Sequence, residues 1–206
     1  MAVLAPAASA GWQELTLPGK AANRYVLTAD GAIQVTSESG TSFLYRPLSE
    51  DERREPILTW RWKVDASGPP TDLTRVGADD RPLAVHIWFR DSAGEGLWPR
   101  LRRATLGVPG YPVPCHVLTY VWGGTEAAGT PLANPYLDGT GALIVLRPGT
   151  TPTGQWYRER VDIAADYRRA FGVNPRDPAF VAISADSDDT ASRSAGTVAN
   201  LTFSAS

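Results

Sequence analysis

The sequence predicts an all-β fold, a two-sheet antiparallel β-sandwich of the jelly-roll, galactose-binding or lectin-like type, with one short helix. Three observations predict it: apolar and polar residues alternate over short segments, turn residues separate these segments, and tryptophan recurs within them. Successive side chains of a strand point to opposite faces of a sheet, so this alternation is the pattern of a half-buried strand.

The segment 57–64 is the clearest example of this alternation. Its apolar residues fall on one face and its polar residues on the other, so we expect the first face to be buried in the core. One face carries Leu58, Trp60, Trp62 and Val64, and the other carries Thr59, Arg61 and Lys63.

Similar segments occur along the whole chain, and turn residues such as Pro18-Gly19, Asp30-Gly31 and Asp138-Gly139 separate them. Many short strands with such punctuation are typical of two packed antiparallel sheets. The expected strands are 13–17, 24–27, 32–37, 42–46, 57–65, 83–91, 117–122, 142–147, 155–163, 180–186 and 197–204.

The one expected helix follows the strand 155–163. Ala164, Tyr167 and Phe171 share a helical face, and Gly172 followed by Pro175 supplies a stop. Two long irregular stretches, 65–80 and 92–116, interrupt the strands, and loops of this length in a compact domain are usually functional or mobile.

Length and charge limit the classes of function. A chain of 206 residues is long enough for its own core, and we expect one β-sandwich domain over residues 12–206. The net charge is −2, with 20 basic and 22 acidic residues interspersed, which gives no support for nucleic-acid binding. No apolar run approaches the roughly 18 residues of a membrane span.

Residues 1–11 bear on the compartment. Ala8-Ser9-Ala10 resembles the small-residue cleavage site of a signal peptide, which predicts a periplasmic or secreted protein. The alternative is that residues 1–11 are a disordered Ala-rich tail. Cys115 is the only cysteine, so it forms no internal disulfide and says little about the compartment.

The motifs Trp60–Val64, Tyr120–Gly123 and Asp186–Thr190 follow one another along the chain. Together with several others they resemble the bacterial family known as domain of unknown function 3047, over about residues 57 to 204. Two departures stand out: Asp186-Ser187-Asp188-Asp189-Thr190 replaces the expected Asp-Thr-Asp-Asn-Thr, and His86 stands where tyrosine is more usual. The resemblance implies an exported bacterial protein with a jelly-roll-like sandwich, and it implies no mechanism. The matching motifs are Trp60–Val64, Asp79-Asp80, Phe89, Tyr120–Gly123, Asn134-Pro135-Tyr136, Trp156, Glu159-Arg160, Asp166–Arg169, Phe171-Gly172 and Asp186–Thr190.

Strand alternation also predicts a candidate binding surface. On strand 83–91 the residues Leu83, Val85, Ile87 and Phe89 are expected in the core, which leaves the others on a second face. If the second faces of strands 83–91, 117–122 and 155–163 adjoin on one sheet, they form an aromatic and charged groove suited to a glycan or a similar polar ligand. The residues expected to bind this ligand are Trp88, Arg90, Trp122 and Arg158.

Two alternatives to a binding groove remain open. In one, the same scaffold is a polysaccharide lyase or hydrolase, in which His86 acts as acid or base together with Glu159 or Tyr120. In the other, the loop 92–116 covers the sheet, its tryptophans form a second core, His86 is hydrogen-bonded in place, and the chain is a structural or interaction module.

The acidic segment after strand 180–186 suggests a metal. Asp186, Asp188 and Asp189 offer the oxygen ligands that calcium prefers, and Asp79 and Asp80, or Asp72, could complete the shell. The alternative is that these aspartates cap turns by accepting hydrogen bonds from local N–H groups. Apart from calcium, no cofactor is expected, and the sequence predicts neither the ligand's identity nor an oligomeric state.

Overall fold

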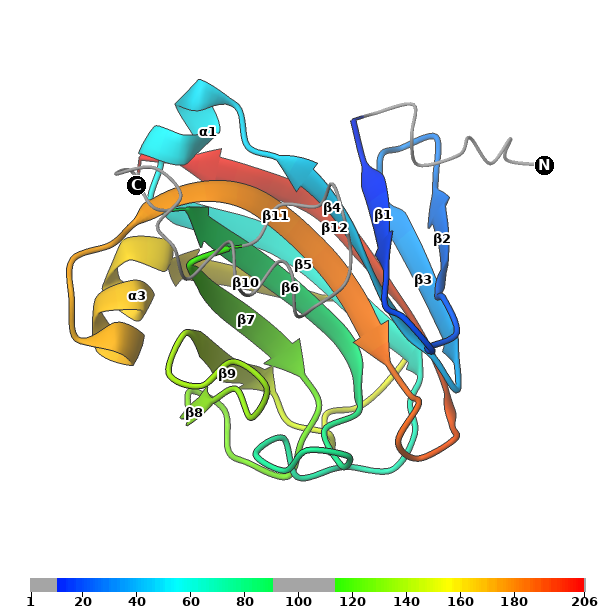
Figure 1. Ribbon diagram of the computed structural model, residues 1–206. Coiled ribbons are helices and arrows are strands. Elements are labelled where there is room, and N and C mark those ends of the chain that lie inside the picture. The colour runs from blue at the N-terminus through cyan, green and yellow to red at the C-terminus, as the bar shows by residue number, and fades with distance from the viewer. Residues whose placement is uncertain (1–10, 91–113, 206) are drawn as a thin grey trace.

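Residues 11–90 and 114–205, the part of the chain that the computed structural model describes, form two β-sheets packed face to face (Figure 1). This arrangement confirms the predicted two-sheet β-sandwich. The seven-stranded sheet has, in spatial order, β1 (Gln13–Thr16), β4 (Thr41–Pro47), β11 (Asp177–Asp186), β6 (Arg81–Arg90), β7 (His116–Trp122), β9 (Gly141–Arg147) and β8 (Pro131–Ala133). The five-stranded sheet has β10 (Tyr157–Asp162), β5 (Ile57–Ala66), β12 (Arg193–Ser204), β3 (Ile33–Glu38) and β2 (Arg24–Leu27).

One strand pair departs from the expected antiparallel pattern. β7 and β9 pair in parallel, with Val117 beside Gly141, while β8 pairs antiparallel with β9 on the other side. Parallel neighbours need a crossover connection, and the chain between β7 and β9 supplies one that contains the three-residue strand β8. β8 is too short to show alternation, which is why the sequence does not predict it.

The described residues contain two helices, one more than expected. The predicted helix is α3 (Ile163–Phe171), which begins at the N-cap Asp162 and ends at Gly172, a residue in the left-handed conformation with φ 69°. The unexpected helix is α1 (Glu50–Arg54). Ser49 and Glu52 form a capping box at its start, a signal that is visible in the sequence as Ser-x-x-Glu.

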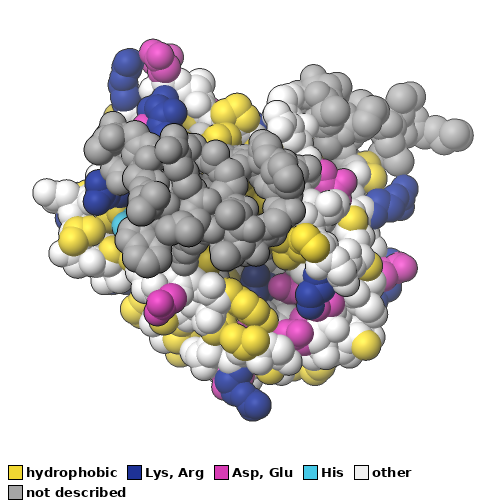
Figure 2. All heavy atoms as spheres, viewed as in Figure 1, with side chains coloured by type: hydrophobic (Ala, Val, Ile, Leu, Met, Phe, Trp, Pro, Cys, Tyr) yellow, Lys and Arg dark blue, Asp and Glu magenta, His cyan; other side chains and the backbone are white. Residues whose placement is uncertain are grey.

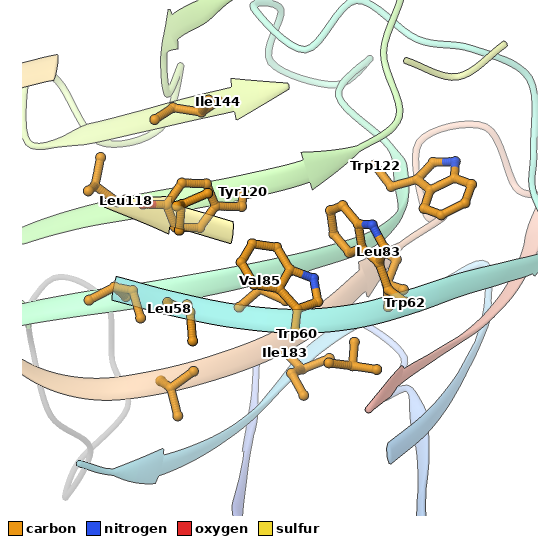
Figure 3. Packing of buried hydrophobic residues seen from close by; sticks show 14 of the residues in the cluster. Leu58, Trp60, Trp62, Leu83, Val85, Leu118, Tyr120, Trp122, Ile144 and Ile183 are labelled. Carbon is orange, nitrogen blue, oxygen red and sulfur yellow. The ribbon is translucent and has the colours of Figure 1, made fainter. Parts of the chain in front are cut away.

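A core rich in tryptophan lies between the two sheets (Figure 3). Trp60 and Trp62 point into it from β5, with their ring centroids 5.4 Å apart and nearly perpendicular planes. β7 faces them with Tyr120, 5.6 Å from Trp60, and with Trp122, 5.6 Å from Trp62. Trp62 makes edge-to-face contacts with Trp60 and Trp122, and such contacts between aromatic rings add about 0.5–1.5 kcal/mol to the effect of burial.

The alternation predicted for β5 and β6 is confirmed. Leu58 and Val64 are fully buried in the core beside the two indoles of β5, while Thr59, Arg61 and Lys63 are half-buried on the outer side. On β6 the expected core residues are Leu83, Val85, Ile87 and Phe89, and all four belong to the core between the sheets. Among the residues described, no helix is long and apolar enough to cross a membrane.

Candidate functional site

The side chains that the sequence predicts on one binding surface lie in different places. β6 and β7 are neighbours in the seven-stranded sheet, but β10 is an edge strand of the other sheet. The expected groove across strands 83–91, 117–122 and 155–163 is therefore wrong. Alternation is a property of a single strand, whereas the strand that it pairs with is determined by contacts between distant segments. The local pattern therefore does not indicate to which sheet a strand belongs.

The positions of Tyr120 and Trp122 correct a second expectation. Both side chains point from β7 into the core between the sheets rather than onto an outer face, and both are almost fully buried (Figure 3). In β7 the residues from Val117 to Trp122 are buried on both sides of the sheet, so alternation could not indicate which side faces the core.

His86 lies on the outer face of β6, as alternation predicts, but it is buried. Its Nδ1 is 3.0 Å from Oγ1 of Thr119, and its Nε2 is 2.8 Å from Oγ of Ser184. Burial lowers the pKa of His86 well below its ordinary value, and the charge of Arg81 acts in the same direction. The imidazole is therefore neutral at pH 7, with a hydroxyl partner on each ring nitrogen.

Neither expected partner of His86 reaches it. Tyr120 lies on the opposite side of the seven-stranded sheet and its Oη donates to Oδ2 of Asp166, 3.1 Å away. Glu159 lies in the five-stranded sheet, where its Oε1 accepts hydrogen bonds from Trp62 Nε1 (2.8 Å) and Arg147 Nε (2.7 Å). The expected acid and base are separated by a sheet or by the core, so the structure does not assemble them.

Trp88 also lies on the outer face of the seven-stranded sheet, where it belongs to a second apolar cluster. Its ring stacks on Tyr45 at 5.2 Å and meets Phe43 at 5.9 Å, and its exposed fraction is 5%. This burial agrees with the alternative of a second core. Residues 92–113 of the loop expected to cover this face lie outside the described residues.

Arg90, a predicted ligand-binding residue and the last residue of β6, is exposed but paired. Its Nε donates to Oδ2 of Asp177 at 2.6 Å, and Arg53 donates to Oδ1 of the same carboxylate at 3.0 Å. Burial acts to raise the pKa of Asp177, but the hydrogen bonds from Arg53 and Arg90 outweigh it and lower this pKa. Arg90 therefore serves an ion-pair network between α1 and the seven-stranded sheet.

The acidic segment after β11 meets the loop before β6 at one end of the sandwich. Asp80 accepts hydrogen bonds from the backbone N–H groups of Asp189 (3.1 Å) and Thr190 (2.8 Å), and the Asp79 N–H donates to Oδ2 of Asp189 at 3.3 Å. Tyr136 Oη donates to Oδ1 of Asp79 at 2.9 Å. Three motifs of the family resemblance therefore converge here, near the end of β11, where acidic and basic side chains lie side by side on the surface (Figure 2).

The metal-capable group in this cluster differs from the predicted trio. Oxygens of Asp80, Asp188 and Asp189 lie within 4.8 Å of one another. Asp186 instead faces Arg81, with Nη2 3.6 Å from Oδ2, and burial raises its pKa to about 8 although Arg81 opposes this. The hydrogen bond with Asp188 also raises the pKa of Asp186, so Asp186 retains its proton more readily than an ordinary aspartate.

The donor set of this cluster fits a hard cation in part. Carboxylate oxygens are the ligands calcium prefers, but calcium takes six to eight of them, so backbone or water oxygens must complete the shell. Lys20 Nζ already bonds Asp188, and both oxygens of Asp80 accept N–H groups. The turn-capping alternative accounts for these hydrogen bonds, and calcium stays a prediction.

Arg158, the last predicted site residue, lies on the outer face of the five-stranded sheet. β10 pairs with β5 so that Arg158 stands directly opposite Arg61, and Arg160 stands opposite Thr59. Residues directly opposite in a pair share a face of the sheet. We call this surface the basic face and define it by Arg24 on β2, Arg61 and Lys63 on β5, Arg158 and Arg160 on β10, and Trp156 just before β10.

Trp156 is the exposed aromatic residue of the basic face. Its exposed fraction is 43%, and the guanidinium of Arg61 lies over its ring at 4.5 Å from the centroid, with Lys63 Nζ at 5.7 Å. A cation over an indole face fixes the ring in one orientation and adds about 0.5–1 kcal/mol at an exposed site. Alternation does place Trp156, Arg158 and Arg160 together. Their approach to Arg61 depends on the pairing of β10 with β5, which no local pattern reveals.

A family model described as "Protein of unknown function (DUF3047)" matches residues 10–202 of the chain. The chain belongs to this family. The match confirms the resemblance drawn from the motifs, and it extends that resemblance to the first strands of the sandwich. No curated protein matches the DUF3047 chain.

Some solved structures are similar to this DUF3047 chain in the arrangement of their strands. One is the xyloglucanase domain of NopAA, a type three effector from Sinorhizobium fredii, in complex with cellobiose, with a TM-score of 0.48, 9% identity, and 94% of this chain and 92% of that chain covered. Another is a family 12 xyloglucanase from Bacillus licheniformis, with a TM-score of 0.43, 9% identity, and 95% and 99% covered. At these values nothing about the activity of the chain follows from the likeness.

Proposed function

We propose that this protein binds a glycan on the basic face, with Trp156 as the stacking platform. The observation that carries the proposal is the exposed indole of Trp156, held beneath the guanidinium of Arg61 on the outer face of a sheet. An aromatic ring offers a sugar an apolar surface, and neighbouring charged groups bind its hydroxyl or carboxylate groups.

The proposal moves the binding surface away from the residues that alternation favours. His86 and Trp88 lie almost completely buried, so a ligand would have to displace packed side chains to reach them. Trp122 belongs to the core between the sheets. Of the four ligand-binding residues predicted, Arg158 is the one on the basic face.

The expected acid–base chemistry receives no support from the geometry. His86, Glu159 and Tyr120 lie on different sides of two sheets, and each already has its hydrogen-bond partners in the fold. We therefore propose a binding protein rather than an enzyme. Export to the periplasm or the exterior, where glycans are plentiful, stays a prediction from residues 1–11.

The experiment is a binding measurement on variants of Trp156, with a panel of soluble plant and bacterial polysaccharides in affinity electrophoresis. Trp156→Ala should weaken binding of any retained polysaccharide at least tenfold, whereas Trp156→Phe should retain most of it because a ring remains. The matched control is Val173→Ala, which removes an exposed apolar side chain, 50% accessible, outside the basic face.

Thermal unfolding of each variant separates binding from folding. Because Trp156 is partly exposed, its removal should leave the melting temperature close to that of the parent protein. Binding that survives Trp156→Ala unchanged, or a panel in which no polysaccharide is retained, would contradict the proposal.

A further inference from the structure

The charge on the basic face differs in sign from the charge of the whole chain. The chain carries a net charge of −2. The acidic residues that share a face with the basic residues are Asp65, which pairs with Lys63 at 2.8 Å, and Glu38, which pairs with Arg193 at 3.3 Å at the rim. The basic face therefore keeps a positive excess after these pairs are counted.

Four arginines supply that excess. In the part of the chain that the structure describes, none of the four forms an ion pair. Three of them are exposed, and Arg61 is half-buried with an Nε that has no hydrogen-bond partner. The four are Arg24 on β2, Arg61 on β5, and Arg158 and Arg160 on β10.

The register places two of these arginines directly opposite one another. Arg158 stands directly opposite Arg61 across the β10–β5 pair, and like charges in this position destabilise a sheet. Arg160 lies two residues further along the same edge strand, on the same face. The acidic group that acts on this set is Asp30 in the turn between β2 and β3, whose pKa is lowered first by its hydrogen bond with Thr28 and also by the charge of Arg61. Arg158 and Arg160 have no ion-pair partner among the described residues. Departures of this kind from a locally stable arrangement are expected at functional sites, and an anion-binding site would account for the unbalanced positive charge.

The sheet is also irregular beside these arginines. Between Ala199, which pairs with Arg61, and Thr202, which pairs with Thr59, β12 carries an irregularity that contains Asn200 at φ 56°. Bulges of this kind are over-represented next to functional sites, where they re-aim side chains. The central strand β12 carries short side chains on this face, including Thr197 and Ala199, and both of these residues are buried.

We infer that the glycan bound on the basic face is acidic, a polysaccharide with uronate carboxylates. This inference rests on the proposed function and names its ligand class. Guanidinium groups bind carboxylates with paired, parallel hydrogen bonds, and a polymer with repeated carboxylates can engage Arg61, Arg158 and Arg160 while one sugar ring stacks on Trp156. A nucleic acid is the less suitable polyanion, because the chain has a pI of about 5.7 and nucleic-acid-binding domains are typically strongly basic.

The test compares polymers chosen to separate the effect of charge from that of the sugar backbone. Polygalacturonate carries the carboxylates, its fully methyl-esterified form has the same backbone without charge, and dextran sulfate carries anionic groups on an unrelated backbone. A single-stranded DNA oligonucleotide is the fourth ligand. Affinities are measured by isothermal titration calorimetry at low salt and again at 0.5 M NaCl.

We expect polygalacturonate to bind at least tenfold more tightly than its methyl ester and than dextran sulfate, with an affinity that falls as salt rises. The double variant Arg158→Gln/Arg160→Gln should lose at least tenfold in affinity for polygalacturonate. Arg54→Gln on α1 is the matched control, because it removes an exposed arginine that lies on a helix outside the basic face and should leave the affinity unchanged.

The outcomes separate the two proposals. Equal binding of polygalacturonate and its methyl ester, both dependent on Trp156, would overturn the acidic ligand and leave glycan binding intact. Equal binding of dextran sulfate would reduce the site to a non-specific anion surface, and tighter binding of the DNA would assign the face to nucleic acid. Either result overturns the uronate inference, and absence of binding to every glycan would overturn both proposals.

Discussion

At the scale of single residues, His86 shows how burial decides what a titratable group can do. A histidine near pH 7 is the usual choice for proton transfer, and this expectation made His86 a candidate acid or base. In the fold it is a neutral ring fixed between the hydroxyls of Thr119 and Ser184, with Phe43 against its edge at 5.2 Å. The hydrogen-bonded side chains of His86, Thr119 and Ser184 therefore belong to the packing on the outer face of the sheet.

The lowered pKa of His86 predicts a pH dependence of stability. A folded-state pKa below the unfolded value means that the unfolded chain binds a proton that the folded chain does not. The free energy of unfolding is therefore highest above pH 6.5 and falls below it, by at most about 1.4 kcal/mol per pH unit from this one group.

The measurement is urea unfolding between pH 7.5 and 5.5 for the parent protein and for His86→Gln. Glutamine cannot take up a proton, so the variant should lose this part of the slope, while the second histidine, His116, remains in both proteins as an internal control. The same slope in both proteins would show that His86 titrates normally and is accessible to water.

At the scale of single elements, the edge strand β10 carries an exposed positive charge that destabilises its pairing with β5. Because Arg158 and Arg61 are direct cross-strand neighbours, Arg158→Gln should stabilise the protein by roughly 0.2–1 kcal/mol at low salt. High salt screens exposed charges, so the gain should shrink at 0.5 M NaCl.

Thermal and urea unfolding at the two salt concentrations check this prediction. Arg54→Gln provides a control of opposite sign, because Arg54 lies 3.7 Å from Glu50 in a favourable i, i+4 pair within α1. A loss of stability in Arg158→Gln at low salt would indicate that Arg158 already has an acidic partner in solution.

The loop between β11 and β12 carries the calcium prediction. If Asp80, Asp188 and Asp189 hold the cation, calcium added to chelator-treated protein should raise the melting temperature, since a ligand at a hundred times its Kd stabilises the folded state by about 2.7 kcal/mol. Asp188→Asn should abolish the increase. Asp51→Asn, which alters an exposed carboxylate on α1, should retain it. An unchanged melting temperature in the parent protein would leave turn capping as the role of these aspartates.

At the scale of the whole molecule, the sequence predicts those features that depend on one segment at a time. Alternation assigned the buried and outer faces of β5 and β6 correctly, because each of these strands has one clear apolar side. Gly172 and Pro175 marked the end of α3 correctly, because a helix stop also depends only on neighbouring residues. The capping box of α1 was equally local, and Ser49 with Glu52 would have revealed that helix.

The features that the sequence did not predict depend on contacts between distant segments. β7 is apolar on both faces, so the orientation of Tyr120 and Trp122 depends on which side meets β5. The pairing of β10 with β5 joins residues about a hundred positions apart in the chain, and it alone creates the basic face. The hydrogen bond between Asp80 and Asp189 likewise joins residues that are 109 positions apart in the chain.

The contrast between Trp156 and the other indoles gives this protein a built-in optical reporter. Trp12, Trp60, Trp62, Trp88 and Trp122 are at most 8% accessible, so among the described tryptophans the fluorescence of Trp156 is the one open to collision with dissolved quenchers. Iodide is drawn toward neighbouring guanidinium groups and caesium is repelled by them, so iodide should extinguish this emission far more efficiently. A bound polymer would shield the ring from both ions, and occupancy of the surface can thus be followed without any attached dye.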